Sequence, residues 1–209
     1  MSHAASSKRR RVLFAIFAAP LAGCVNIGRD APVHVSYELH DLGRSQPVSR
    51  APLDRVVLVG WSAANSFYDS TSIVYSRTPG ALAYYQLASW SEQPAEQLGR
   101  LFARRLAGVG LFRDVATLSG PVRGDWLVEL ELDRMLHDDA NPPGVARVSV
   151  FARIVDRASR RTVDSRRFDE EEPLGTESAA GAVKAFDAAV TRLLDASVAW
   201  VVEAALRAR

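Results

Sequence analysis

The first 24 residues constrain most where the folded domain can begin, because the residues before Cys24 have the pattern of a leader that is not part of the domain. A basic run, Lys8–Arg11, precedes a short apolar run, Val12–Leu21, and two small residues then precede Cys24. A charged region, an apolar region and a small-residue cleavage site, in this order, are typical of a signal peptide. The apolar run is shorter than the roughly 20 residues that a membrane-spanning helix needs. We therefore expect residues 1–23 to be removed and the folded domain to lie beyond them.

The residues at the cleavage site, Leu21-Ala22-Gly23-Cys24, resemble the lipobox of bacterial lipoproteins. The resemblance implies that the leader is cut before Cys24 and that the Cys24 thiol carries acyl chains such as palmitate. Two or more acyl chains hold a protein stably at a membrane surface, whereas one chain does so only marginally. Cys24 is the only cysteine, so a lipidated chain has no disulfide and must be stable through its core alone. The alternative is an ordinary secretory leader with a chance cysteine.

The residues after the leader suit a single domain on a short tether. Residues 24–32 include Gly28 and Pro32 and are expected to form the tether, and residues 33–209 the domain. A composition that is 48% hydrophobic and 24% charged indicates a globular domain. The net charge of +2 includes the basic leader, so the domain is close to neutral and nothing indicates the clustered basic face that nucleic-acid binding needs. We expect no nucleic-acid partner.

Alternation of apolar and polar residues predicts most of the strands. The clearest alternation begins at Trp126, and residues 55–60 form an unbroken apolar run of the kind found in central strands. Pro79-Gly80 predicts a turn, because Pro fixes φ and Gly accepts a positive φ. Strands are therefore expected at residues 33–39, 55–60, 72–77, 82–87, 111–118, 126–133, 146–154 and 162–168, with a β-hairpin around the Pro-Gly turn and an antiparallel meander formed by the last three.

Apolar residues three and four positions apart predict two amphipathic helices, at about residues 92–109 and 177–206. Ser91 is the expected N-cap of the first helix, with Pro94 in its first turn. Each helix must bury its apolar stripe, and a sheet offers one face for both. The predicted fold class is α+β, with two layers: a mostly antiparallel sheet and two amphipathic helices packed on one face.

Residues 72–112 combine several features in a fixed order. The first hairpin strand ends in Ser76-Arg77, the second, at residues 82–87, contains Tyr84-Tyr85, and Trp90 and Pro94 open the helix. This order, with the lipobox and the length, resembles the ABC-type transport auxiliary lipoprotein family. That family includes the paraquat-inducible protein C lipoproteins, which accompany mammalian-cell-entry (MCE) lipid transporters. The resemblance covers nearly all of the mature chain, but residues 61–70 match nothing in the family pattern and have no assigned role.

The resemblance implies a non-enzymatic, lipid-anchored periplasmic subunit of an MCE/ABC-type intermembrane lipid transport system. Its partners would be an MCE-domain protein and the ABC permease–ATPase complex, with self-association into a ring left open. Val25 follows Cys24 where an Asp would favour retention at the inner membrane, so the expected location is the periplasmic face of the outer membrane. Two alternatives remain: a lipid-binding shuttle or chaperone with an apolar pocket, and a regulator of envelope assembly.

Four residues are the candidates for contact with a partner: Tyr75, Arg77, Tyr84 and Trp90. Tyr, Trp and Arg are enriched at interface hot spots, because they combine a large contact area with a polar group. A residue such as Trp90, just before a helix, also commonly packs beneath it, so a core position is the alternative. The sequence contains neither a phosphate-binding loop nor a nucleophile elbow, and we predict no catalytic residues, metal or cofactor.

The remaining charged groups favour structural interpretations. His34 and His40 have the parity of an exposed strand face, and His137-Asp138-Asp139 predicts a solvated loop rather than a metal site. Arginines between residues 153 and 167 could face anionic lipid headgroups. They could equally pair across strands with the acidic run at residues 169–172, and we favour this pairing.

Overall fold

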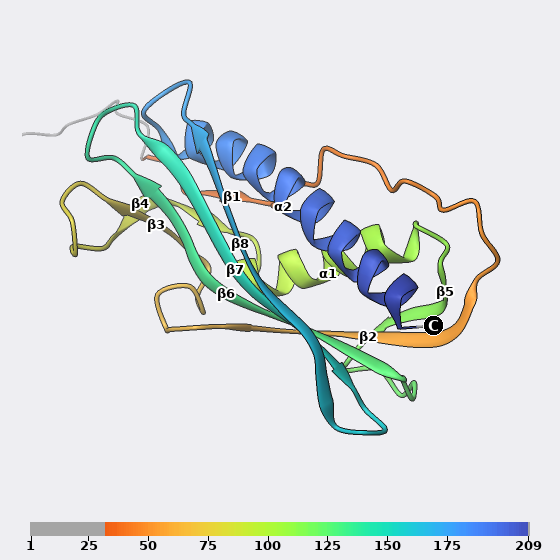
Figure 1. Cartoon of the computed structure of the whole chain (residues 1–209). Helices are drawn as coiled ribbons and strands as arrows, with labels where there is room; N and C mark the ends of the chain where they lie inside the picture. The colour runs from red at the N-terminus through yellow and green to blue at the C-terminus, as the bar shows by residue number, and fades with distance from the viewer. Residues whose placement is uncertain (1–31, 209) are drawn as a thin grey trace, which may run out of the picture. The chain divides into compact units, whose positions relative to one another are not determined.

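An eight-stranded sheet and two helices make up residues 32–208, which the computed structural model describes (Figure 1). The expected leader, the acylation of Cys24 and all but the last residue of the tether concern residues outside this range. The strands are β1 (Val35–Tyr37), β2 (Leu53–Ala63), β3 (Ser72–Ser76), β4 (Ala83–Trp90), β5 (Phe112–Thr117), β6 (Trp126–Asp138), β7 (Val145–Asp156) and β8 (Arg161–Pro173), and the helices are α1 (Pro94–Ala107) and α2 (Ala179–Arg207).

Strand β6 is the centre of the sheet, because three strands pair with it. Along one edge it pairs with β7, which pairs with β8, and both pairs are antiparallel. On the other edge, Trp126–Leu132 pairs with β2, and Leu136–Asp138 pairs with β3. The sheet therefore divides into two branches on this side of β6: β2 continues to β5, and β3 continues through β4 to β1. The interior position expected for residues 55–60 is confirmed, because β2 has a neighbour on each side, and so are the expected hairpin and meander.

The expectation of a mostly antiparallel sheet is confirmed only in part. The meander and the β3–β4 hairpin are antiparallel, but the pairs β1–β4, β2–β5, β2–β6 and β3–β6 are parallel. The residue pattern of a strand reports which face is buried, and it carries no signal for the direction of a neighbour that is distant in sequence. The parallel pairs join such distant segments, whereas the antiparallel pairs join consecutive ones.

Both helices pack on one face of the sheet, as expected. Helix α1 contacts β2, β5 and β6, helix α2 contacts β7 and β8, and the two helices contact each other. Trp126, Phe102 and Phe186 are fully buried between the layers. The N-cap of α1 is Gln93 rather than the expected Ser91, and its side chain makes no capping hydrogen bond. Pro94 occupies the first helical turn, where it has no N–H that needs a partner.

Residues 38–52, between β1 and β2, run across the two helices, and we call this segment the strap (Figure 1). Polar side chains of the helices accept hydrogen bonds from its backbone. These bonds join Leu39 N to Gln97 Oε1 (2.8 Å), His40 N to Asp187 Oδ1 (2.8 Å) and Leu42 N to Thr191 Oγ1 (2.9 Å). Because the strap has no strand partner over this stretch, the helices satisfy part of its backbone.

Arg105 of α1 is the polar centre of the strap contact. Its side chain is 4% exposed, and its guanidinium group pairs with Asp41 of the strap and Asp195 of α2. It also donates to the backbone oxygen of Arg44 at 3.2 Å. Burial alone raises the pKa of Asp41, but the hydrogen bonds from Arg105 and from Gly43 outweigh it and hold the pKa below 3.8. One buried arginine thus joins the strap and both helices.

Candidate functional site

The hairpin formed by β3 and β4 brings together three of the four partner-contact candidates. Tyr75 lies near the end of β3, Arg77 begins the turn, and Tyr84 lies near the start of β4. Gly80 has φ of +82°, which confirms the predicted Pro-Gly turn. The turn is exposed from Arg77 onward, so the hairpin presents these side chains at its tip.

Arg77 is held by two carboxylates and one aromatic ring. Its Nε donates to Asp139 Oδ2 at 2.9 Å, and its Nη2 lies 3.7 Å from a carboxylate oxygen of Glu177. The guanidinium carbon lies 5.2 Å from the centre of the Tyr75 ring, within the range of a cation–π contact. The hydrogen bond with Asp139 raises the pKa of Arg77. Three segments that are distant in sequence therefore fix this cation at the hairpin tip.

A chain of hydrogen bonds on the core side of the hairpin joins β4 to β6 and to the β6–β7 connection. Tyr85 Oη lies 2.7 Å from His137 Nδ1, and His137 Nε2 lies 2.9 Å from the backbone oxygen of Pro143. A carbonyl oxygen only accepts, so Nε2 carries the proton and Nδ1 accepts from the tyrosine hydroxyl. Burial first, and the nearby charge of Asp139 next, raise the pKa of Tyr85 to about 12. The phenol is thus a fixed donor at neutral pH.

The prediction of a solvated loop at residues 137–139 is wrong for His137 and Asp139, which are buried. Strand β6 continues to Asp138, His137 is fully buried within it, and Asp139 is 4% exposed. A bulge between Leu132 and Arg134 shifts the alternation by one residue, so that Met135 and His137 face the core. Across residues 32–208, no three His, Cys, Asp or Glu side chains group as metal ligands.

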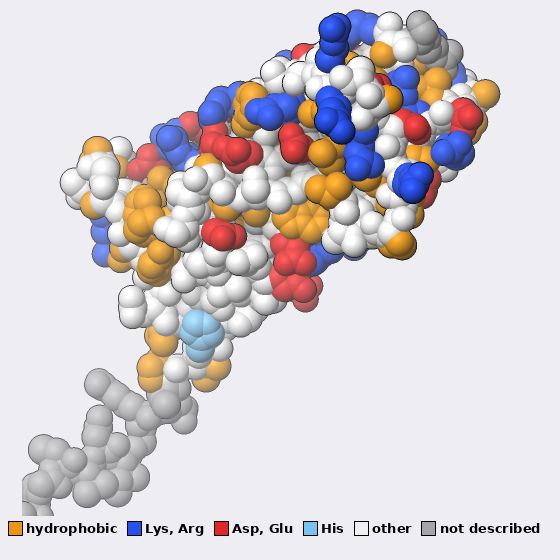
Figure 2. All heavy atoms as spheres, turned by 90° about the horizontal axis from the view of Figure 1, so that it is seen from below, with side chains coloured by type: hydrophobic (Ala, Val, Ile, Leu, Met, Phe, Trp, Pro, Cys, Tyr) orange, Lys and Arg blue, Asp and Glu red, His pale blue; other side chains and the backbone are white. Residues whose placement is uncertain are grey.

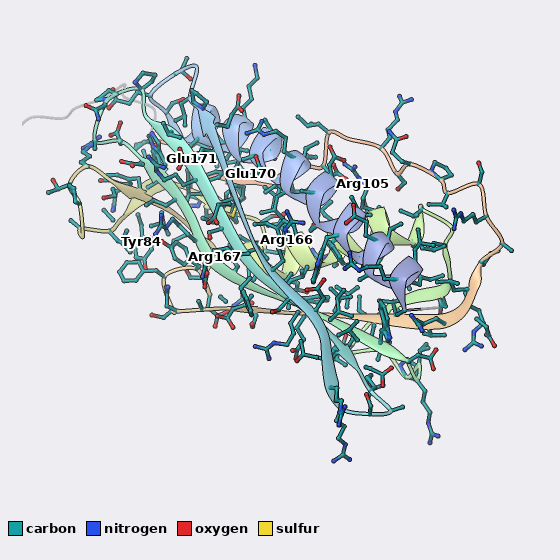
Figure 3. The ribbon with its side chains drawn as sticks, viewed as in Figure 1. Tyr84, Arg105, Arg166, Arg167, Glu170 and Glu171 are labelled. Carbon is teal, nitrogen blue, oxygen red and sulfur yellow. The ribbon has the colours of Figure 1, made fainter. Side chains whose placement is uncertain are left out.

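Tyr84 is the exposed aromatic residue of the site (Figure 3). Its side chain is 36% exposed, and its ring stacks on Phe67 with 5.4 Å between the ring centres. Phe67 belongs to the segment 61–70, for which the sequence predicted no role. This segment lies where the chain leaves β2 and joins β3, the two strands that share one edge of β6. Phe67 of this segment therefore holds the Tyr84 ring in place.

Trp90 does not belong to this surface, and its assignment as a partner contact is corrected. Its side chain is 2% exposed and packs edge-to-face on Phe186 of α2, with 5.7 Å between the ring centres. It occupies the core position that the sequence left as the alternative. We use the name hairpin cluster for the three remaining candidates, Tyr75, Arg77 and Tyr84, together with Tyr85, Asp139 and Glu177, which line a shallow hollow of about 150 Å³.

The charged residues of the meander pair differently from the prediction. The acidic run pairs with Arg147 and Arg192 rather than with the arginines between residues 153 and 167. Arg167 pairs with Asp133, and Arg153 lies 3.7 Å from Glu129. Figure 3 shows the reason: the glutamates lie farther along β8 than the arginines that precede them. In Figure 2, basic and acidic side chains are interspersed over much of the face shown.

Solved structures share the fold of this domain. A protein of family DUF330 from Xanthomonas campestris matches with a TM-score of 0.72 and 23% identity, over 82% of this chain and 98% of that one. An uncharacterized protein matches with a TM-score of 0.61 and 12% identity, over 80% of this chain and 99% of that one. A PelC dodecamer from Paraburkholderia phytofirmans reaches a TM-score of only 0.38, which supports no inference about assembly. No curated protein matches the sequence.

The solved structures share the two-layer fold of this domain, and the sequence comparison identifies the family. Residues 37–197 match the family described as ABC-type transport auxiliary lipoprotein component, and the chain belongs to it. Membership gives the chain an accessory role in ABC-type transport, as part of a complex associated with the cell envelope. The family is a transport component rather than an enzyme family. Within residues 32–208, neither helix is apolar enough over the length that a membrane crossing requires.

Proposed function

We propose that this chain is a non-enzymatic, lipid-anchored periplasmic subunit of an MCE/ABC-type intermembrane lipid transport system, and that it docks the transporter at the outer membrane. The observation that carries the proposal is the family match, because it runs from β1 to α2 and includes the whole hairpin. The partners are an MCE-domain protein and the ABC permease–ATPase complex.

The hairpin cluster is the proposed contact for the partner. Tyr84 offers an exposed ring that Phe67 holds in place, and Arg77 keeps much of its surface exposed while two carboxylates fix it. A side chain that is already fixed loses little conformational entropy when it binds. Pre-organised Tyr and Arg side chains of this kind are typical of hot spots in interfaces.

Docking explains the structure better than the alternative of a lipid shuttle. A shuttle needs an apolar cavity of ligand size, and we would expect it between the sheet and the helices. In this domain large side chains fill that space, among them Trp126, Phe102 and Phe186. A hollow of about 540 Å³ does open between the strap and α1, but charged and polar side chains such as Glu38, Arg100 and Arg104 line much of it. Such a lining does not suit an acyl chain.

The proposed acylation of Cys24 supplies the membrane attachment. An anchored protein meets its partner at a high effective concentration, so a modest interface is sufficient. We expect the Cys24→Ala variant protein to be released from the membrane fraction and the cell to lose the transport function. Full function of a chain that has left the membrane would contradict the role of the anchor.

The direct test is purification of the full-length lipoprotein from detergent-solubilised native membranes, with mass spectrometry of the proteins that accompany it. We expect an MCE-domain protein and an ABC permease. Cell-wall enzymes or outer-membrane assembly factors would instead support the role of envelope regulator. Tyr84→Ala should reduce the recovery of the partner, and so should Arg77→Lys, which keeps the charge beside Asp139 but loses the planar fork. Val163→Ala, at a side chain of similar exposure on β8, is the matched control.

A further inference from the structure

The pairing registers bring three chain segments to one end of the sheet. Strand β3 runs parallel to the last residues of β6, so the hairpin turn lies beside the β6–β7 connection. Val145 pairs with Pro173, so the connection from β8 to α2 lies at the same end. Figure 1 shows these connections together at the left. We call this end, made of residues 77–82, 139–144 and 174–178, the hairpin end.

The hairpin end has few charged residues, and these form ion pairs with one another. Its three segments contain only three charged residues, Arg77, Asp139 and Glu177, and these pair with one another. The other residues there are mainly Gly, Pro, Ala, Thr and Leu. Exposed apolar side chains also lie at or near this end: Leu82 (37% exposed), Leu87 (47%), Val33 (76%) and Val35 (42%).

The opposite end of the sheet has the contrary character. Trp126 pairs with Asp156, so the segments 118–125 and 156–161 lie together there, and we call them the arginine end. They contain Arg123, Arg157, Arg160 and Arg161. Only two acidic residues accompany these four arginines, Asp125 and Asp156, so this end carries a net positive charge. The domain is therefore polarised along its strands.

The chain enters the domain toward the hairpin end. Strand β1 is parallel to β4, with Val35 opposite Ala88, so residues before Val35 lead toward the start of β4 and the hairpin turn. Nine residue steps separate Cys24 from Val33, and an extended chain covers about 30 Å over that length. Strand β6 has 13 residues and spans about 40 Å. A tether of this length cannot place the arginine end at the membrane while the chain enters near the other end.

We propose that the hairpin end of this domain rests on the lipid bilayer, with Leu82 at the boundary between headgroups and acyl chains and Leu87, five residues farther along the chain in β4, among the headgroups. This inference rests on the proposed acylation of Cys24. The paired charges and small residues of this end lower the cost of leaving water, and the apolar side chains gain from burial in the interface. The arginine end then points away from the membrane, and the partner contacts Tyr84 and the exposed part of Arg77 from beside the domain, at the level of the headgroups.

Spin labels on the full-length lipoprotein test this orientation. Acylated Cys24 has no free thiol, and the chain has no other cysteine, so one introduced cysteine is labelled alone. Leu82→Cys is matched in exposure by Val163→Cys (39%), and Leu87→Cys by Leu118→Cys (47%). Each labelled protein is reconstituted in vesicles of phosphatidylethanolamine and phosphatidylglycerol. Collision rates with oxygen, which concentrates in lipid, are compared with those of a water-soluble nickel complex.

We expect the labels at positions 82 and 87 to shift toward oxygen in vesicles, and those at positions 163 and 118 to stay accessible to nickel. Equal nickel access at all four positions would mean that the domain stands off the bilayer, and this would overturn the proposal. A shift at position 163 instead of 82 would also overturn it. Failure of the protein to remain with the vesicles would refute the anchor itself. Co-purification of the transporter is measured separately, so the docking role and the orientation can fail independently.

Discussion

Replacement of Arg105 is the sharpest test of how this fold is held together. Arg105→Ala removes the group that joins the strap to both helices and leaves Asp41, whose side chain is 14% exposed, without its partner. Breaking a buried ion pair from one side costs about 3–5 kcal/mol, because the remaining charge stays buried. Asp195 is 58% exposed and water can solvate it, so we expect a loss near the lower limit, about 3 kcal/mol.

The assay is urea unfolding at pH 7, supported by thermal unfolding. A loss of about 3 kcal/mol corresponds to a fall in Tm of roughly 6–12 °C for a domain of this size. Arg104→Ala is the matched control, since Arg104 is the neighbouring residue of α1 and is exposed. A double variant that also carries Asp41→Ala should lose less than the two single losses together, because no buried charge is then left alone.

The effect of Arg105→Ala must also depend on pH with a defined sign. The pKa of Asp41 lies below 3.8 in the folded protein, so the ion pair contributes stability above about pH 4. That contribution disappears as the pH falls through the folded pKa and Asp41 takes up a proton. The difference in unfolding free energy between wild type and Arg105→Ala should therefore shrink below pH 4. Equal losses for Arg104→Ala and Arg105→Ala, or a difference that does not change with pH, would refute the reasoning.

Three further predictions concern single contacts. Gly144→Ala should destabilise the domain more than Gly80→Ala, because both glycines have positive φ but only at Gly144 would the new Cβ clash with a backbone oxygen, that of Asp138; urea midpoints measure the difference. Absorbance titration should show Tyr85 ionising near pH 12, with stability falling as the pH rises above 10, and the loss of this ionisation in Tyr85→Phe would confirm the assignment. Trp200→Phe should cost about 1.5–3 kcal/mol in urea unfolding, the usual value of a hydrogen bond to a charged group such as that from its indole to the Asp164 carboxylate at 3.0 Å. A Trp200→Phe variant as stable as wild type would show that this bond contributes nothing net.

Regular patterns made much of this fold predictable. The alternation from Trp126 and from Ala146 reflects one buried face, and both strands form with the expected partners. The helices were predictable for the same reason, since apolar residues three or four positions apart mark the face of a helix that packs on the core. The start of α1 differs from the predicted one, because Gln93 caps the helix without a side-chain hydrogen bond and so leaves no capping signal in the sequence.

The features that could not be predicted depend on contacts between distant segments. The bulge in β6 buries His137, and the residues around it give no local sign of where an extra residue enters the strand. The strap is another example, because its polar residues have the composition of a loop while their partners lie on α1 and α2. Arg105 itself occupies a helix position that any surface arginine could hold, and only the packing of the strap makes it buried.

The separation of Tyr84 from Trp90 shows how one irregularity decides the composition of a site. The two residues are six positions apart, so uninterrupted alternation along β4 would place them on the same face. Between the pairs Ser72–Ser89 and Val74–Tyr84, however, two steps along β3 lie opposite five along β4, so the alternation is interrupted there. The result is that Trp90 enters the core against α2, whereas Tyr84 stays 36% exposed at the hairpin. The interruption therefore lets Trp90 pack against α2 while the Tyr84 ring stays exposed at the hairpin tip.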